Sequence, residues 1–295
     1  MIKWELDPFP YCVIDNFLSN DDFQKLKEEL KNTNNFLQTS FNTPLEKKSI
    51  YKDKNLKSEA NKIIKIMSSK RIKDIIASQI KTSKIISLAE TEDFSGYSPY
   101  HVTTEKGSLG SHVDHSYIEE GRYRHIANTI FYASEKWVPG WGGETILFSR
   151  NGLKEIVRIE PLPNRLILFI HTANSFHGVN IYKSNNNIER RTFYHDYYVS
   201  KNEIETVMKI LNINRKKKLI HSIHGTTFIP SIPFGIKKLK IRKILDAKNL
   251  RYIPTYLIYY LNRITKSYHY SYKTVPFIKY FYYIYKFIKR KVFFN

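Results

Sequence analysis

The chain has 295 residues, of which 42% are hydrophobic and 15% aromatic, and it carries a formal net charge of +21. This composition excludes a disordered or fibrous protein and supplies enough apolar residues for one large or two ordinary domains. The single cysteine, Cys12, excludes an internal disulfide and a metal site built from cysteines, and it favours a reducing compartment.

Neither a targeting segment nor a membrane span is expected. The first residues, MIKWELDPFP, lack the apolar core and the small-residue cleavage site of a signal peptide. No run of about 18 apolar residues occurs, so no transmembrane segment is predicted. The expected location is the cytoplasm, including peripheral attachment to the inner face of a membrane.

The N-terminal region has the pattern of one strand followed by helices. Tyr11–Ile14 is rich in residues that favour strands, and a helix begins after Ser19 or Asn20, either of which can cap it. Two further stretches, about Leu56–Ser68 and Ile72–Ile80, repeat apolar residues at helical spacing. We expect these helices to cover one face of a sheet.

From about Lys84 to Ser200 the period of the apolar residues changes from 3.6 to 2. Short strands are predicted at ANTIFYAS, ETILFS, EIVRIEP, NRLILFI and RRTFYHDYYVS, separated by turns that contain Gly, Pro or Asn. Many short strands without intervening helices predict a double-stranded β-helix, the jelly roll of cupin-like proteins. The expected fold class is mainly β with flanking helices.

The C-terminal region differs in charge. Residues 236–295 hold fifteen Lys and Arg against one acid, Asp246, and so carry +14 of the net charge. A helix there would have a basic and an aromatic face, typical of binding to an anionic membrane surface. Nucleic-acid contact and packing on the jelly roll are the alternatives, and an A+T-rich coding bias also produces such a composition. The predicted organisation is a strand with supporting helices (1–83), a jelly-roll core (84–200), a helix and linker (201–235) and a basic aromatic extension (236–295).

The stretch GSHVDHS places His112 and Asp114 two residues apart on an extended segment. Because side chains alternate along a strand, both point to the same side and can reach one ion. The third ligand should come from a distant strand, and His177 in SFHGV is the candidate. Two imidazoles and one carboxylate leave half of an octahedral coordination sphere open, which suits non-haem Fe(II) better than zinc.

Five motifs in chain order, H-x-D, G-G-E-T, P-x-R-L-I-L-F, S-F-H-G-V and R-R-x-F-Y, resemble the 2-oxoglutarate/Fe(II) dioxygenases, in particular their prolyl 4-hydroxylase-like branch. The resemblance covers about residues 95–200 and is weaker from PFPYCVIDNFL onward. It implies that His112, Asp114 and His177 hold Fe(2+), with 2-oxoglutarate and O2 as cosubstrates and ascorbate as the reductant. The implied reaction hydroxylates a C–H bond of an unidentified substrate, which is a prolyl or other peptide side chain or a small or glycan-linked metabolite, and forms succinate and CO2.

The resemblance also implies that a basic residue after the distal histidine binds the far carboxylate of 2-oxoglutarate. Arg190 and Arg191 both qualify, and a guanidinium group suits a carboxylate because it donates two parallel hydrogen bonds. Arg191 shares a strand face with the aromatic residues that follow it, so we choose Arg191. Tyr132 matches a tyrosine that the family often uses for the same carboxylate, and Asn128 lies on the same face. We therefore expect Arg191, Tyr132 and Asn128 to bind the cosubstrate.

Other residues of these motifs have simpler interpretations. His171 lacks the Gly-Val that follows His177 and is interpreted as a structural histidine at a strand end. Gly142 and Gly143 are expected to allow a tight turn or a close backbone approach.

Two other functions stay open. A nucleic-acid demethylase of the AlkB type fits the basic charge, but that family usually shows a second arginine in the pattern R-x-x-x-x-x-R, whereas Tyr197 stands at that distance from Arg191. A non-catalytic cupin-like binding protein would bind metal weakly and would not consume 2-oxoglutarate.

Overall fold

The structure is a computed structural model that describes residues 2–31, 37–42, 46–52, 58–92, 99–150, 152, 154–172, 174–184, 188–210 and 227–228. The N-terminal elements are β1 (Tyr11–Ile14), α1 (Asn20–Lys31), β2 (Leu37–Asn42), β3 (Glu46–Lys52), α2 (Ser58–Met67), α3 (Lys70–Ile80) and β4 (Ile86–Ser87). The remaining elements are β5 (Tyr100–Thr103), β6 (Ser108–Val113), β7 (Tyr117–Ile118), β8 (Tyr123–Tyr132), β9 (Thr145–Phe148), β10 (Glu155–Ile159), β11 (Arg165–Ile170), β12 (His177–Val179), β13 (Arg190–Ser200), α4 (Ile204–Ile210) and β14 (Thr227–Phe228).

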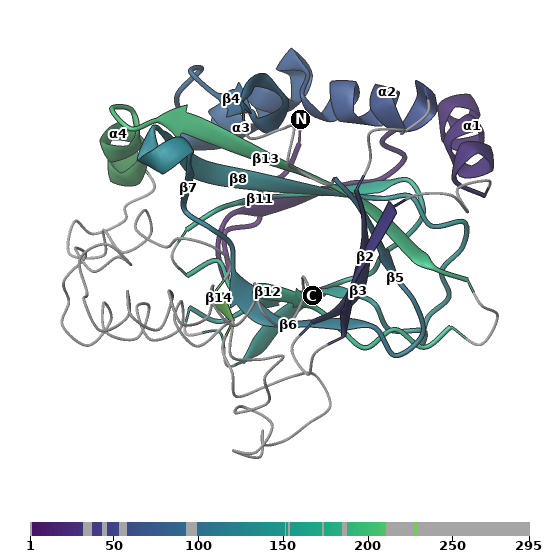
Figure 1. Ribbon diagram of the computed structural model, residues 1–295. Helices are drawn as coiled ribbons and strands as arrows, with labels where there is room; N and C mark the ends of the chain where they lie inside the picture. Colours follow the sequence, from purple (N-terminus) through teal and green to yellow (C-terminus); the bar gives the residue numbers. More distant parts are fainter. Residues whose placement is uncertain are drawn as a thin grey trace, which may run out of the picture.

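The strands form two facing layers of antiparallel sheet (Figure 1). One layer has the order β1-β11-β8-β13-β5, and the other has β6-β12-β9-β10. Strand β3 pairs with both β5 and β6 and so joins the two layers at one edge. This arrangement confirms the mainly β, jelly-roll fold that the alternating strands predicted.

Helices α1, α2 and α3 lie over the outer face of the layer that contains β8 and β13 (Figure 1). Each helix buries one face against the strands: α1 contributes Phe23, Leu26 and Leu30, and α2 and α3 contribute isoleucines at helical spacing. These residues share one apolar cluster with the outward side chains of β8, β11 and β13. The predicted buttressing of one sheet face is therefore confirmed.

Ser19, one of the two predicted caps, begins α1. Its Oγ accepts a hydrogen bond from the backbone N–H of Asp22 at 3.2 Å, which satisfies one of the free donors of the first turn. The sequence did not predict β2 and β3, whose mixture of polar and apolar residues lacks a clean alternation. Their hairpin matters because β3 closes the edge between the two layers.

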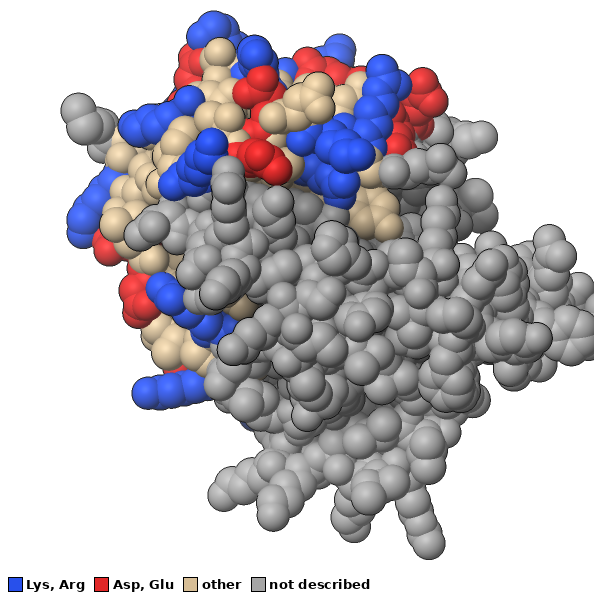
Figure 2. Space-filling view, turned by 90° about the vertical axis from the view of Figure 1, so that its left-hand side faces the viewer, with Lys and Arg blue, Asp and Glu red and all other residues tan. Residues whose placement is uncertain are grey.

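Of the C-terminal region, the structure describes α4 and the two-residue strand β14, which pairs with β6. The predicted basic extension, 236–295, lies outside the described residues, as does most of the linker before it. Among the helices that the structure describes, none is both long and apolar enough to cross a membrane. On the face shown in Figure 2, the described surface carries Lys and Arg beside Asp and Glu, without a broad region of one charge.

Candidate metal centre

Strands β6 and β12 bring the three predicted ligands together. The strands are antiparallel neighbours, and His177 lies directly opposite His112 in their register. Asp114 follows β6 immediately, so His112 and Asp114 point to the same side as predicted. One donor atom from each of the three residues lies within 4.8 Å of the others. The local pairing of two short strands therefore converts residues that are far apart in sequence into one cluster.

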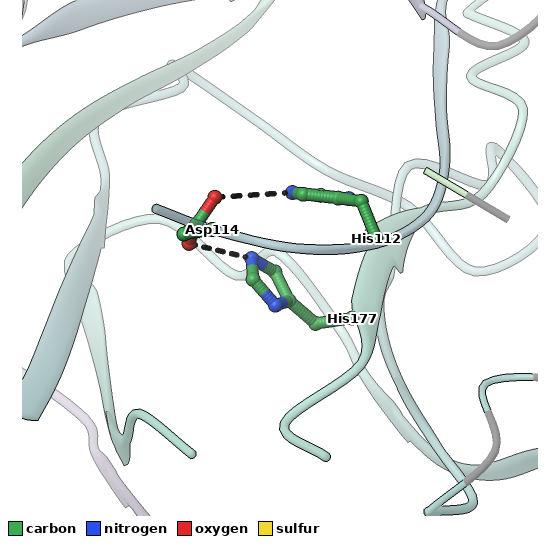
Figure 3. Close-up of side chains that lie close together, drawn as sticks. All are labelled: His112, Asp114 and His177. Carbon is green, nitrogen blue, oxygen red and sulfur yellow. Dashed lines mark ion pairs between the residues drawn. The ribbon is translucent and has the colours of Figure 1, made fainter. Parts of the chain in front are cut away.

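The carboxylate of Asp114 faces both imidazoles and points one oxygen toward each ring, as Figure 3 shows. Its Oδ1 is 3.5 Å from Nε2 of His112, and its Oδ2 is 3.3 Å from Nε2 of His177. The other ring nitrogens are held by the backbone: Nδ1–H of His112 donates to the carbonyl of Gly110 at 2.8 Å, and Nδ1–H of His177 donates to Ser175 at 2.9 Å. These bonds fix the tautomer in which each Nε2 faces the cluster with its lone pair.

Burial and mutual charge set the protonation of the three groups. Burial, followed by the neighbouring His177, lowers the pKa of His112. Burial acts to raise the pKa of Asp114, but the two histidines outweigh it and hold that pKa well below its ordinary value. Burial also acts to lower the pKa of His177, yet the charge of Asp114 outweighs it and the pKa is raised. A carboxylate that stays ionised beside two imidazoles is a donor set for a divalent cation.

Arg191, which was predicted to bind the cosubstrate with Tyr132, does not lie beside Tyr132. Arg191 points toward the helices: its Nη1 donates to the carbonyl of Leu30 at 2.6 Å, and its Nε donates to Glu189 at 3.1 Å. Phe193 and Tyr197, which share its face, belong to the core beneath the helices. The aromatic residues therefore mark the outer face of β13, and alternation puts Arg190 on the inner face.

Arg190 is 1% exposed and sits over the ring of Tyr132, 5.1 Å from its centroid. Its Nε donates to the carbonyl of Gly143 at 2.7 Å, and its Nη2 donates to Oγ1 of Thr145 at 3.3 Å. The Tyr132 hydroxyl is 2.6 Å from the same Thr145 oxygen, and burial raises the pKa of Tyr132 to about 12. A buried guanidinium, a protonated phenol and a hydroxyl form a donor cluster that suits a carboxylate.

The cluster lies close to the ligands along β9. Thr145 is two residues from Leu147, which is the register partner of His177, so the two positions are about 7 Å apart along the strand. Gly143 has a positive φ, and a Cβ there would come within 3.1 Å of the Arg190 side chain. A Cβ on Gly142 would clash with the backbone carbonyl oxygen of Ile181, so the expected close backbone approach at the Gly-Gly turn is confirmed.

Asn128 does not join this cluster. Its Nδ2 donates to Oδ2 of Asp114 at 3.1 Å and to Oδ1 of Asp196 at 2.9 Å, so the side chain lies at the ligand end of β8 rather than near Arg190. Asp196 is buried, and burial raises its pKa to about 7. Asp196 and Thr145 could not be assigned a role from the sequence, because only the pairing of β13 and β8 and the position of β9 reveal their neighbours.

The other histidines that the structure describes lie at several places in the fold. His171 is buried with its ring stacked on His125 at 4.3 Å, as expected for a structural histidine. His195 lies on the outer face, where its Nε2 is 3.2 Å from Ser68 Oγ and 3.1 Å from Ser87 Oγ. The ring centroid of His101 lies 4.4 Å from that of Tyr194, with the two planes tilted by 35°.

Comparison with known proteins gives one family match. Residues 97–196 match the model of the 2OG-Fe(II) oxygenase superfamily. No curated protein sequence matches the chain.

Similar folds occur among solved structures. A prolyl-4-hydroxylase from Pseudomonas putida has 16% identity and a TM-score of 0.45, with 64% of this chain and 92% of that chain covered. The viral collagen prolyl hydroxylase of Paramecium Bursaria Chlorella virus-1 in complex with 2OG has 16% identity and a TM-score of 0.42, with 66% and 98% covered. HygX from Streptomyces hygroscopicus, with nickel and 2-oxoglutarate bound, has 10% identity and a TM-score of 0.43, with 64% and 82% covered. At these scores the likeness carries no argument about the substrate.

The residues present fit the iron that the family match implies. Two imidazole nitrogens with backbone-fixed tautomers and one ionised carboxylate converge at one point, and this donor set is typical of non-haem iron sites. The matched range contains His112, Asp114 and His177 together with Arg190 and Tyr132. Residues 97–196 therefore form a 2OG-Fe(II) oxygenase domain, which indicates a 2-oxoglutarate-dependent dioxygenase.

Proposed function

We propose that the chain hydroxylates a C–H bond of an unidentified substrate, with O2 and 2-oxoglutarate consumed and succinate and CO2 formed. In this reaction one oxygen atom enters the substrate as a hydroxyl group and the other enters succinate. The observation that carries the proposal is the convergence of His112, Asp114 and His177 close to the buried Arg190. The prolyl 4-hydroxylase-like motifs favour a prolyl or other peptide side chain, or a small or glycan-linked metabolite, as the substrate.

The residues at the two ends of the site have different roles, one in binding the metal and the other in binding 2-oxoglutarate. His112, Asp114 and His177 would hold ferrous iron, which supplies the redox chemistry between O2 and 2-oxoglutarate. Arg190 would bind the far carboxylate of 2-oxoglutarate through charge-assisted hydrogen bonds, and the hydrogen-bonded hydroxyl pair of Tyr132 and Thr145 would donate its remaining hydrogen to it. The neighbouring apolar side chains of Ile130 and Leu147 exclude water from this end of the site.

Succinate production tests the proposal. The full chain with Fe(II), 2-oxoglutarate and ascorbate as reductant should release succinate, and Asp114→Ala should abolish the release. Ascorbate should raise the yield by keeping the iron ferrous. No succinate from the wild-type chain with any candidate substrate would favour a cupin-like binding protein instead.

The AlkB-type alternative gains no support when Arg190 takes the place of Arg191 as the arginine that binds 2-oxoglutarate. Asp196 stands at the sixth position after Arg190, where the pattern R-x-x-x-x-x-R needs a second basic residue.

We also propose that residues 236–295 attach the enzyme peripherally to an anionic membrane surface on the cytoplasmic side. Their +14 charge and aromatic residues support this proposal. Sedimentation with vesicles that contain an anionic lipid tests it: the full chain should pellet with them and should stay in solution with neutral vesicles. Equal partition would exclude electrostatic attachment.

A further inference from the structure

Asn128 is hydrogen-bonded to two buried carboxylates at once. Its Nδ2 group donates to Asp114 and to Asp196, at 3.1 and 2.9 Å. Since a carboxylate oxygen accepts and only the nitrogen of the amide donates, the two acids fix which way the amide is turned. Asn128 is 4% exposed and Asp196 is 5% exposed. This amide is therefore a buried bridge with one orientation.

The bridge connects the two layers of the fold. Asn128 on β8 is the register partner of Asp196 on β13, so the backbone holds these two side chains next to each other on the inner face. Asp114 follows β6, which belongs to the other layer. The amide is consequently a direct contact between a metal ligand and the layer that carries Arg190.

A second group of potential ligands lies behind this bridge: His115, His125 and Asp196, whose donor atoms are also within 4.8 Å of one another. The two ring nitrogens of His125 face carbonyl oxygens at 2.9 and 3.0 Å, and these oxygens can only accept. Nε2 of His115 is 2.9 Å from the hydroxyl of Tyr198. The two imidazoles stack with their planes 21° apart, so their in-plane lone pairs do not converge on one ion. This group supports Asp196 by packing and is not a second metal site.

We propose that Asn128 and Asp196 are positioning residues for Asp114. The amide keeps Oδ2 of Asp114 hydrogen-bonded, so that Asp114 binds the ion through its other oxygen alone. Carboxylates bind metals through one oxygen or two, and the single mode leaves more positions for 2-oxoglutarate and O2. Asp196 holds the second hydrogen of the amide and prevents it from turning. The inference rests on the proposed function, because it assumes that the triad binds a metal.

Binding of Mn(II) to the full chain, measured by calorimetry without O2, tests the inference independently of turnover. The wild-type chain should bind one ion. Asn128→Leu keeps the size of the side chain but removes the donor, and it should weaken Mn(II) binding about tenfold to a hundredfold, as expected for a residue that orients a metal ligand. The Mn(II)-loaded variant should also bind 2-oxoglutarate more weakly, because a carboxylate bound through two oxygens occupies one of its positions.

Two substitutions of Asp196 provide a matched pair. Asp196→Asn keeps an oxygen that accepts from Asn128, so its Mn(II) affinity should stay within about threefold of the wild type, a difference of about 0.7 kcal/mol. Asp196→Leu removes the acceptor and should weaken binding in the same direction as Asn128→Leu. Thermal unfolding of each variant identifies any that does not fold. Among the variants that fold, the order of their Mn(II) affinities tests the positioning role.

The outcomes distinguish failure of the proposed function from failure of the positioning role of Asn128 and Asp196. If the wild-type chain binds no Mn(II), the proposed function fails and the inference fails with it. If the wild type binds one ion and Asn128→Leu or Asp196→Leu binds Mn(II) and 2-oxoglutarate equally well, only the positioning role is wrong. Two ions per wild-type chain would overturn the interpretation of the second group as packing support.

Discussion

The two faces of β8 and β13 share the same backbone and differ in what their side chains do. On the outer face, Phe131 and Phe193 pack beneath the helices in a continuous apolar core. On the inner face, Asn128, Arg190 and Asp196 are buried although they are polar or charged. Burial of polar groups lowers the free energy of unfolding unless the groups are paired. The buried polar residues of the inner face are therefore explained by their role in activity and not by stability. The outer face should govern stability and the inner face should govern activity.

The largest effect is expected at the ligands. His112→Ala or Asp114→Ala removes one of three donors, and succinate release should fall by more than about a hundredfold, beyond the loss typical of residues that only orient ligands. The fold should remain, because the outer core is untouched. Succinate assays and circular dichroism measure the two effects, and a ligand variant that keeps wild-type turnover would contradict the division between faces.

A cavity in the outer face should produce the opposite result. Phe131 is fully buried and its ring contacts those of Phe17 and Phe23 at 5.7 and 6.2 Å. Phe131→Ala should lower the free energy of unfolding by about 3–5 kcal/mol. Mn(II) affinity of the folded variant should stay at the wild-type value.

Ile156→Ala is the matched control, because Ile156 is 39% exposed and its substitution should cost no more than about 0.5 kcal/mol. Denaturant unfolding compares the two variants. Equal free energies of unfolding for Phe131→Ala and Ile156→Ala would show that the outer core does not govern stability.

The two neighbouring arginines of β13 test the difference between the inner and outer faces within a single strand. Arg190→Ala removes the hydrogen bonds proposed for 2-oxoglutarate and should raise the KM for it about tenfold to a hundredfold, at about 1.5–3 kcal/mol for a charge-assisted bond. Arg191→Ala loses its bond to the carbonyl of Leu30 and should reduce stability by about 1 kcal/mol without changing that KM. Steady-state kinetics at varied 2-oxoglutarate decides between them, and a larger KM effect from Arg191→Ala would reverse the assignment of faces.

A further effect is a change in the pH dependence of stability. Burial raises the pKa of Asp196 from 3.8 to about 7 in the folded chain. Between these values the folded chain keeps a proton that the unfolded chain has released, so this residue lowers stability as the pH rises from about 4 to 7. Asp196→Asn removes that loss, and its stability relative to the wild type should increase with pH by at most about 1.4 kcal/mol per unit.

Thermal unfolding at pH 5 and pH 8, with a chelator present, measures this difference. The other titrating groups are common to both proteins, so the comparison isolates position 196. A difference that is the same at both pH values would show that Asp196 titrates normally in the folded chain.

The sequence predicted much of the site because period-2 alternation is a local property. His112 and Asp114 lie on one side of an extended segment, and this follows from spacing alone. Alternation alone does not reveal which face of β13 is the inner one. Arg191 was chosen because it shares a face with aromatic residues, and those residues belong to the core beneath the helices. Thr145 and Asp196 gain their roles from partners on other strands, and no local pattern reveals those partners.

The metal ligands predicted from the sequence converge in the structure, but their role in binding iron stays a prediction. Anaerobic titration of the full chain with Fe(II) in the presence of 2-oxoglutarate tests it most directly, with Asp114→Ala beside the wild type. We predict one Fe(II) bound per wild-type chain and binding weakened by more than about a hundredfold in the variant. Equal binding by both chains, or none by the wild type, would contradict an iron site at His112, Asp114 and His177.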